Sequence, residues 1–156
     1  MKINFVLNGQ PVVLESEPTR RFLDILREDF GLTAAKEGCG EGECGACVVL
    51  LDGEPVNSCL LAAVQLEDRT VLTLEGYKQT ERFKALARGF AQAGSVQCGF
   101  CTPGFVLAAE ALLAKNPHPD EAEVRQAIEG NLCRCTGYSM IVDGILAAAR
   151  EGEGLW

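Results

Sequence analysis

Cysteine is the residue type with the clearest capacity for chemistry in this sequence, which contains eight cysteines among 156 residues and one histidine. An even number of cysteines can form disulfides, but that framework is typical of small exported domains. The first residues form an alternating apolar segment rather than a charged leader followed by a long apolar stretch. With 47% hydrophobic residues, the chain also has little need of disulfides for stability. Metal binding by thiolates is therefore the leading interpretation.

The first four cysteines follow the pattern C-x4-C-x2-C-x11-C and are Cys39, Cys44, Cys47 and Cys59. The first three have the spacing of the plant-type [2Fe–2S] motif. Four of the ten residues from Gly38 to Cys47 are glycines, so the backbone can turn several N–H groups toward an anionic cluster. A phosphate-binding loop would end in Lys-Ser or Lys-Thr, and a four-cysteine zinc site usually has two short cysteine pairs. The pattern favours a [2Fe–2S] cluster over both.

The other four cysteines follow the pattern C-x2-C-x31-C-x-C and are Cys98, Cys101, Cys133 and Cys135. Taken alone, these two pairs could bind zinc or an iron–sulfur cluster. Each pair precedes a predicted helix, which begins near Thr102-Pro103 or Thr136-Gly137. Because the N-terminus of a helix has free N–H groups and positive potential, two such helices would suit one anionic cluster.

The segments that must position the first set predict an α+β domain. Ile3–Leu7 and Pro11–Glu15 form a hairpin around Asn8-Gly9, Val48–Leu51 and Glu54–Ser58 form a second one around Asp52-Gly53, and Val71–Leu74 adds a strand. Thr19 is the predicted N-cap of a helix that ends at Gly31.

After residue 76 the apolar residues recur with a helical period. Four helices are predicted. The first contains Phe83–Phe90, and the second begins at Thr102 and ends before Asn116-Pro117. The third begins with a capping box at Asp120 and Glu123, and the fourth extends from Tyr138 to Arg150. Together they predict a four-helix bundle. We therefore predict a [2Fe–2S] domain over 1–76, a helical [2Fe–2S] domain over 77–150 with a linker at 76–80, and a loose tail over 151–156.

The charge and the apolar content of the chain exclude some kinds of partner. The formal net charge is −8, which disfavours nucleic acid because phosphate backbones are bound by clustered Lys and Arg. No apolar run approaches the roughly 20 residues needed to cross a bilayer. We expect a cytoplasmic protein with neither a membrane nor a nucleic-acid partner. The chain shows no acid, base or nucleophile constellation, so we expect no catalytic residue on it.

Three segments together resemble the iron–sulfur small subunits of the xanthine oxidase family of molybdenum hydroxylases. They are Gly38–Cys47, Val96–Gly104 with the sequence VQCGFCTPG, and Gly130–Tyr138 with the sequence GNLCRCTGY. The resemblance extends over about residues 2–150 and both cysteine sets match it without a gap. It implies a ferredoxin-like (β-grasp) N-terminal domain and a four-helix C-terminal domain, each with one [2Fe–2S] cluster.

The resemblance also implies a function and an assembly. The chain would relay electrons between a molybdopterin on a separate large subunit and FAD on a separate medium subunit, in a dimer of heterotrimers. The C-terminal cluster would lie beside the pterin, which by resemblance has the cytosine dinucleotide form, and the N-terminal cluster would face FAD. Gln97 and Cys135 occupy the positions that approach the pterin in this family.

We further predict a partner surface around Gln97–Thr102 and Leu132–Tyr138. Two alternatives differ from this function: a free-standing ferredoxin-type electron carrier, and a zinc-stabilised interaction module without a redox role. The helical cluster domain argues against the first, since simple plant-type ferredoxins lack one. The spacing of the first cysteine set argues against the second.

Overall fold

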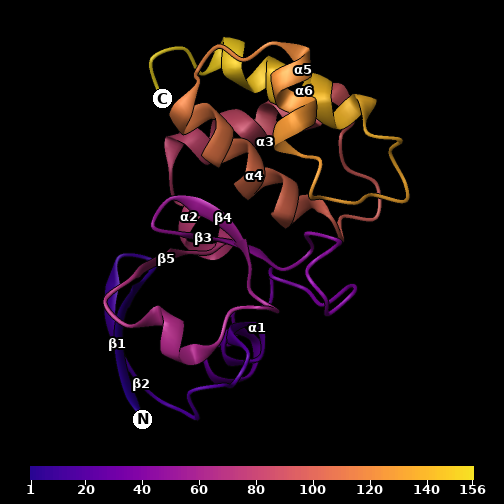
Figure 1. Cartoon of the computed structure of the whole chain (residues 1–156). Helices are drawn as coiled ribbons and strands as arrows, with labels where there is room; N and C mark the ends of the chain where they lie inside the picture. Colours follow the sequence, from indigo (N-terminus) through magenta and orange to yellow (C-terminus); the bar gives the residue numbers. More distant parts are fainter.

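A computed structural model describes all residues, 1–156, and places the two halves of the chain end to end. Figure 1 shows the sheet of the N-terminal half at one end and the helices of the C-terminal half at the other, with the N-terminus at the sheet end and the C-terminus at the helical end. Helix α4 (Thr102–Lys115) packs against the sheet, and irregular loops from both halves meet near its lower end. This mixed sheet with a helical half confirms the predicted α+β class.

The N-terminal half is built on a five-stranded sheet with the order β2-β1-β5-β3-β4. Its strands are β1 (Lys2–Leu7), β2 (Gln10–Glu15), β3 (Val48–Leu51), β4 (Glu54–Asn57) and β5 (Thr70–Leu72). The central pair β1–β5 is parallel and the other pairs are antiparallel. Both hairpin turns have positive φ at their two central residues, 52° and 79° at Asn8-Gly9 and 51° and 84° at Asp52-Gly53, as the predicted turns require.

Strand β3 joins two hydrophobic cores, because both of its faces are buried. Val49 and Leu51 belong to the core of the N-terminal half, together with β1 and the first helix. Val48 and Leu50 belong instead to the core of the helical half. The two halves therefore pack as one unit through this strand and α4.

The helical half contains α3 (Glu81–Ala93), α4 (Thr102–Lys115), α5 (Glu121–Ala127) and α6 (Ser139–Glu151). Two predicted starts are confirmed: α4 has Pro103 in its first turn, and Asp120 and Glu123 form the capping box of α5. Helices α3 and α6 cross closely. A Cβ on Gly89 would lie 2.3 Å from the carbonyl oxygen of Gly144, so glycine allows their backbones to approach.

The predicted N-terminal helix differs from the observed one. Thr19 is not its cap, because Arg21 has extended backbone geometry and pairs with Ala62. Helix α1 (Phe22–Asp24) starts after it and continues as a π-helical turn over Ile25–Asp29. A short 3₁₀ helix, Ala63–Leu66, follows the last cysteine of the first set.

The predicted last strand and linker also need correction. β5 ends at Leu72, because the side chain of Asn8 takes the Thr73 amide at 2.8 Å. Leu74–Tyr77 then forms the short helix α2. The junction is not a loose connection, since Tyr77 is buried and its hydroxyl donates a hydrogen bond of 2.5 Å to Glu110 on α4.

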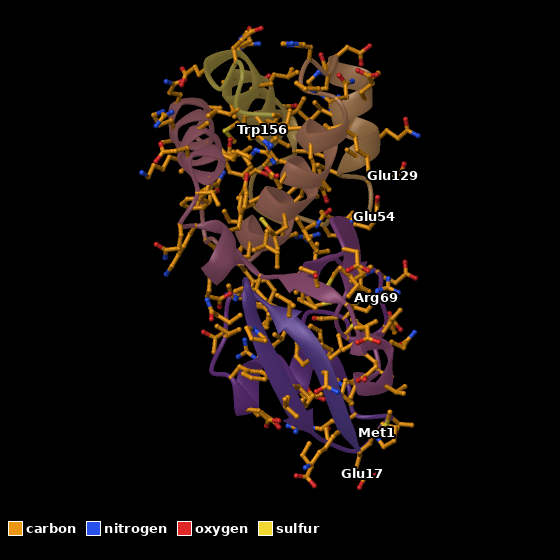
Figure 2. All side chains as sticks on the ribbon, turned by 90° about the vertical axis from the view of Figure 1, so that its left-hand side faces the viewer. Met1, Glu17, Glu54, Arg69, Glu129 and Trp156 are labelled. Carbon is orange, nitrogen blue, oxygen red and sulfur yellow. The ribbon has the colours of Figure 1, made fainter.

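The predicted loose tail is wrong as well. The Trp156 indole N–H donates to Glu110 at 2.6 Å, and the Arg82 guanidinium donates to the Leu155 carbonyl at 2.6 Å. Figure 2 shows Trp156 among the helices, at the opposite end of the molecule from Met1 and Glu17. The buried carboxylate of Glu110 thus ties the end of the chain to α2, α3 and α4.

None of these helices has the length and apolar character that crossing a membrane requires.

Candidate metal centres

The first cysteine set lies on an irregular loop between the π-helical turn and β3, and its last member follows β4. Gly40, Gly42 and Gly45 have φ of 69°, 80° and 72°, a range in which a side chain would be strained. These turns direct three backbone N–H groups, from Glu41, Glu43 and Cys44, to the sulfur of Cys39 at 3.2–3.4 Å. The loop therefore forms the cradle of N–H groups that the glycine content predicts.

The thiols of this set have different environments. The three backbone N–H groups lower the pKa of the exposed Cys39 thiol to about 7. Burial, together with the neighbouring Cys47 thiol, raises the pKa of Cys59 to about 11. Cys39 also acts electrostatically on Cys59, so side chains 20 residues apart in the sequence belong to one group of thiols.

The second set is positioned by two helices of the helical half. Cys101 is the N-cap residue of α4, and Cys98 lies in the turn before it. Cys133 and Cys135 lie in the loop that leads to α6. Burial and the neighbouring Cys133 thiol raise the pKa of Cys101 to about 12, and Cys98 contributes electrostatically. The two sequence pairs are therefore together in space.

The sulfur of Cys133 is enclosed by the residues that follow it. It accepts a hydrogen bond from the Thr136 hydroxyl at 3.1 Å and one from the Thr136 amide at 3.4 Å. Burial raises the pKa of Cys133, but these two contacts and the Cys135 amide outweigh it and bring the pKa to about 7. The Cys133 amide itself donates to the Tyr138 hydroxyl at 3.1 Å.

The two cysteine loops touch one another, which the sequence did not indicate. The Leu132 amide donates to the carbonyl oxygen of Cys44 at 2.9 Å, and the Asn131 side chain donates to the carbonyl oxygen of Gly45 at 3.3 Å. A Cβ on Gly104 would lie 2.3 Å from that same Gly45 oxygen. Residues adjacent to one set therefore bind the backbone of a residue in the other.

These surroundings fit two anionic clusters with thiolate ligands. Each half offers four cysteines, and the sulfurs of Cys39 and Cys133 already accept N–H or O–H donors. The buried Thr102 hydroxyl, next to Cys101, has no protein partner. No three His, Cys, Asp or Glu side chains form a group that could hold a single metal ion. A [2Fe–2S] cluster spreads its four thiolates over two irons, so its ligands need not meet at one point.

The surface beside the second set is exposed and partly apolar. Gln97, Cys98 and Cys135 are exposed, and three large apolar residues around them have 45–54% of their surface accessible: Val96, Phe100 and Leu132.

Two family models match the chain. One, described as a 2Fe-2S iron-sulfur cluster binding domain, matches residues 5–74. The other, described as a [2Fe-2S] binding domain, matches residues 73–146. The chain therefore has two [2Fe–2S] domains.

Similar proteins are found among characterised sequences and solved structures. The small FeS subunit of nicotinate dehydrogenase from Eubacterium barkeri is 53% identical over 89% of this chain and 88% of that subunit. The iron-sulfur-binding subunit of xanthine dehydrogenase from Escherichia coli O157:H7 is 44% identical over 92% of this chain and 91% of its own length. A chain of quinoline 2-oxidoreductase from Pseudomonas putida 86 superposes with a TM-score of 0.89, at 47% identity and 98% coverage of both chains. With two cluster domains and relatives of this similarity, the chain belongs to the iron–sulfur subunits of the xanthine oxidase family, the electron-transfer chains of multi-subunit oxidoreductases.

Proposed function

We propose that this chain carries single electrons between a molybdopterin centre on a large subunit and FAD on a medium subunit. Cys39, Cys44, Cys47 and Cys59 would bind the first [2Fe–2S] cluster, and Cys98, Cys101, Cys133 and Cys135 the second. When bound, the clusters supply one-electron acceptors, while substrate chemistry belongs to the molybdenum subunit. Two observations support this assignment. The cysteine segments resemble those of the family's iron–sulfur subunits, and the chain is 53% identical to the small FeS subunit of nicotinate dehydrogenase.

The contact between the two cysteine loops is the main structural observation in favour of electron transfer through this chain. The Leu132 amide is adjacent to Cys133, and it donates to the carbonyl of Cys44 at 2.9 Å. One hydrogen bond and a few covalent bonds therefore connect a proposed ligand of one cluster to a proposed ligand of the other. This contact supports electron transfer in series from one half to the other.

The exposed surface beside the second set supports docking of the molybdopterin subunit there. Gln97 and Cys135 are both exposed, as a pterin contact in a partner requires. Phe100 and Leu132 are exposed apolar side chains within the segments Gln97–Thr102 and Leu132–Tyr138 that we propose as the partner surface. The first set would then face the FAD subunit, because its ligand Cys39 is exposed in the other half.

The remaining features of the assembly follow the family resemblance. We propose a dimer of heterotrimers, a cytosine dinucleotide on the pterin, and a cytoplasmic location. The domain division at residues 76 and 77 and the tail at 151–156 are part of the same proposal, although β3 and Glu110 pack across these boundaries.

Purification of the untagged chain from its native host tests the function. We expect about four irons per chain and two larger companions that carry molybdenum and FAD. Four irons without companions would instead support a free-standing ferredoxin-type carrier. Zinc in place of iron, with no visible absorption, would overturn the redox assignment and support the zinc-stabilised module.

The docking surface has a separate test. Gln97→Ala and Arg134→Ala each change an exposed side chain beside the second set and should weaken assembly with the large subunit. Glu17→Ala, at the far end of the N-terminal half (Figure 2), is the matched surface control. Unchanged assembly and turnover in both variants would contradict the proposed surface.

A further inference from the structure

Thr136 makes the one side-chain O–H contact to a cysteine sulfur among the hydrogen bonds of the two sets. Its Oγ1 lies 3.1 Å from the sulfur of Cys133. The cysteine sulfurs of the first set accept only backbone N–H groups, at Cys39 and Cys44. A side-chain substitution leaves backbone donors in place, so only the second set contains a donor that a single mutation removes cleanly.

The direction of the Thr136 proton follows from its other neighbour. A threonine hydroxyl has one proton to donate and lone pairs that accept. The Tyr138 amide donates to the Thr136 oxygen at 3.2 Å, which leaves the hydroxyl proton available for the Cys133 sulfur. Thr136 provides the one hydroxyl that donates to this sulfur, alongside the Thr136 and Cys135 amides.

Tyr138 holds this arrangement in place despite an unfavourable backbone. Its φ is 73°, a value that bulky residues rarely adopt unless other contacts impose it. Its hydroxyl accepts the Cys133 amide at 3.1 Å, and its ring lies 6.4 Å from that of Phe105 in the core. The segment from Cys133 to Tyr138 is thus closed on itself, with the Thr136 hydroxyl in a fixed position.

Burial strengthens the contact. Thr136 is 8% exposed, whereas Cys39 of the first set is exposed to solvent. A hydrogen bond away from water acts on a charge through a lower effective dielectric than one at the surface.

We propose that Thr136 is a positioning residue whose hydroxyl, through the sulfur of Cys133, sets the reduction potential of the C-terminal cluster. This inference rests on the proposed function, in which Cys133 is a ligand of that cluster. Hydrogen bonds to the sulfurs are one of the determinants of [2Fe–2S] potentials. The O–H stabilises the reduced state more than the oxidised state, because one added electron increases the negative charge on the sulfur. The electron arrives by the proposed transfer between the molybdopterin and FAD subunits, and the proton stays on the threonine oxygen.

Potentiometric EPR titration of the native assembly tests the inference with Thr136→Val, which keeps the shape and the backbone amide but removes the O–H. At a fixed potential, we expect the ratio of reduced to oxidised C-terminal cluster to fall by up to about tenfold, equivalent to a negative shift of up to about 59 mV for one electron. Thr136→Ser retains the hydroxyl and should restore most of the wild-type potential. The N-terminal cluster in the same molecule is the internal control and should not shift.

Several outcomes would overturn the inference. An unchanged C-terminal potential in Thr136→Val with full iron content would exclude the hydroxyl as its determinant. An equal shift in Thr136→Ser would assign the effect to packing, and an equal shift of both clusters would assign it to a general change in the fold. If Thr136→Val does not retain iron, Thr136→Ala takes its place, because it also removes the O–H and keeps the backbone amide. An unchanged C-terminal potential in that variant would contradict the inference. Iron content and the two wild-type signals test the proposed function separately.

Discussion

Replacement of Gly104 by alanine tests whether the two cysteine loops must lie as close as the structure places them. Gly104 is buried in the first turn of α4. The added Cβ would lie 2.3 Å from the Gly45 carbonyl oxygen and 3.0 Å from the Asn131 amide nitrogen. The nearest atom belongs to the backbone, so it cannot move aside by a rotamer change, and α4 or the Cys44 loop must shift.

Two opposing effects determine the sign. Alanine is favoured over glycine in a helix by roughly 0.5–1 kcal/mol, and this alone would stabilise the variant. Overpacking at a closely packed site costs about 1–3 kcal/mol. We therefore expect a net loss of about 1–2 kcal/mol, which lowers the midpoint of thermal unfolding by about 2–8 °C for a chain of this size. The magnetic interaction between the two reduced clusters should weaken too, because the loops move apart.

Thermal unfolding at one scan rate and EPR of the reduced chain are the assays. Gly130→Ala is the matched control, since a Cβ at this neighbouring glycine would meet nothing within 4 Å and its φ is not positive. The control should stay within about 0.5 kcal/mol of the wild type. A Gly104→Ala variant that is as stable as the wild type, with the same EPR interaction, would refute the reasoning.

Three further predictions concern the rest of the fold. Gly89→Ala should destabilise the chain by about 1–3 kcal/mol, because its Cβ would lie 2.3 Å from a backbone oxygen of α6. Calorimetry measures the loss, and an unchanged unfolding midpoint would contradict the close crossing of α3 and α6. Glu110→Ala should cost roughly 2–4 kcal/mol, because it leaves the hydroxyl of Tyr77 and the indole of Trp156 without an acceptor; a loss below 1 kcal/mol in denaturant unfolding would show that the tail is not held there. Lys115→Met should change stability by no more than about 0.5 kcal/mol, although it removes an ion pair between the halves, because that pair is exposed; a larger loss in the same assay would contradict this.

Local signals in the sequence were enough to predict many of the elements. Asn8-Gly9 and Asp52-Gly53 predicted both hairpin turns because each type I′ turn needs two residues with positive φ. The capping box at Asp120 was correct because its hydrogen bonds join residues three apart. The glycines around Cys39 predicted the N–H cradle for the same reason: the backbone conformation they allow is local.

The features that sequence reasoning missed depend on residues far apart. The hydrogen bond from Leu132 to Cys44 joins positions 88 residues apart. The periodicity of apolar residues in the sequence does not predict a contact between such distant loops. The contact that holds the tail could not be predicted from the sequence of the tail, because the acceptor Glu110 lies on α4. One missed feature did have a signal. The uninterrupted apolar run Val48–Leu51 indicates a strand buried on both faces, and it therefore pointed to a helical layer packed on the sheet.

EPR of the fully reduced native assembly tests the central claim, that this chain holds two [2Fe–2S] clusters in electronic contact, most directly. We predict two distinct [2Fe–2S] signals of equal intensity, with splittings at low temperature that disappear when either cluster alone is reduced. A single signal, or two signals without mutual splitting, would contradict an electron path through the contact between Cys44 and Leu132.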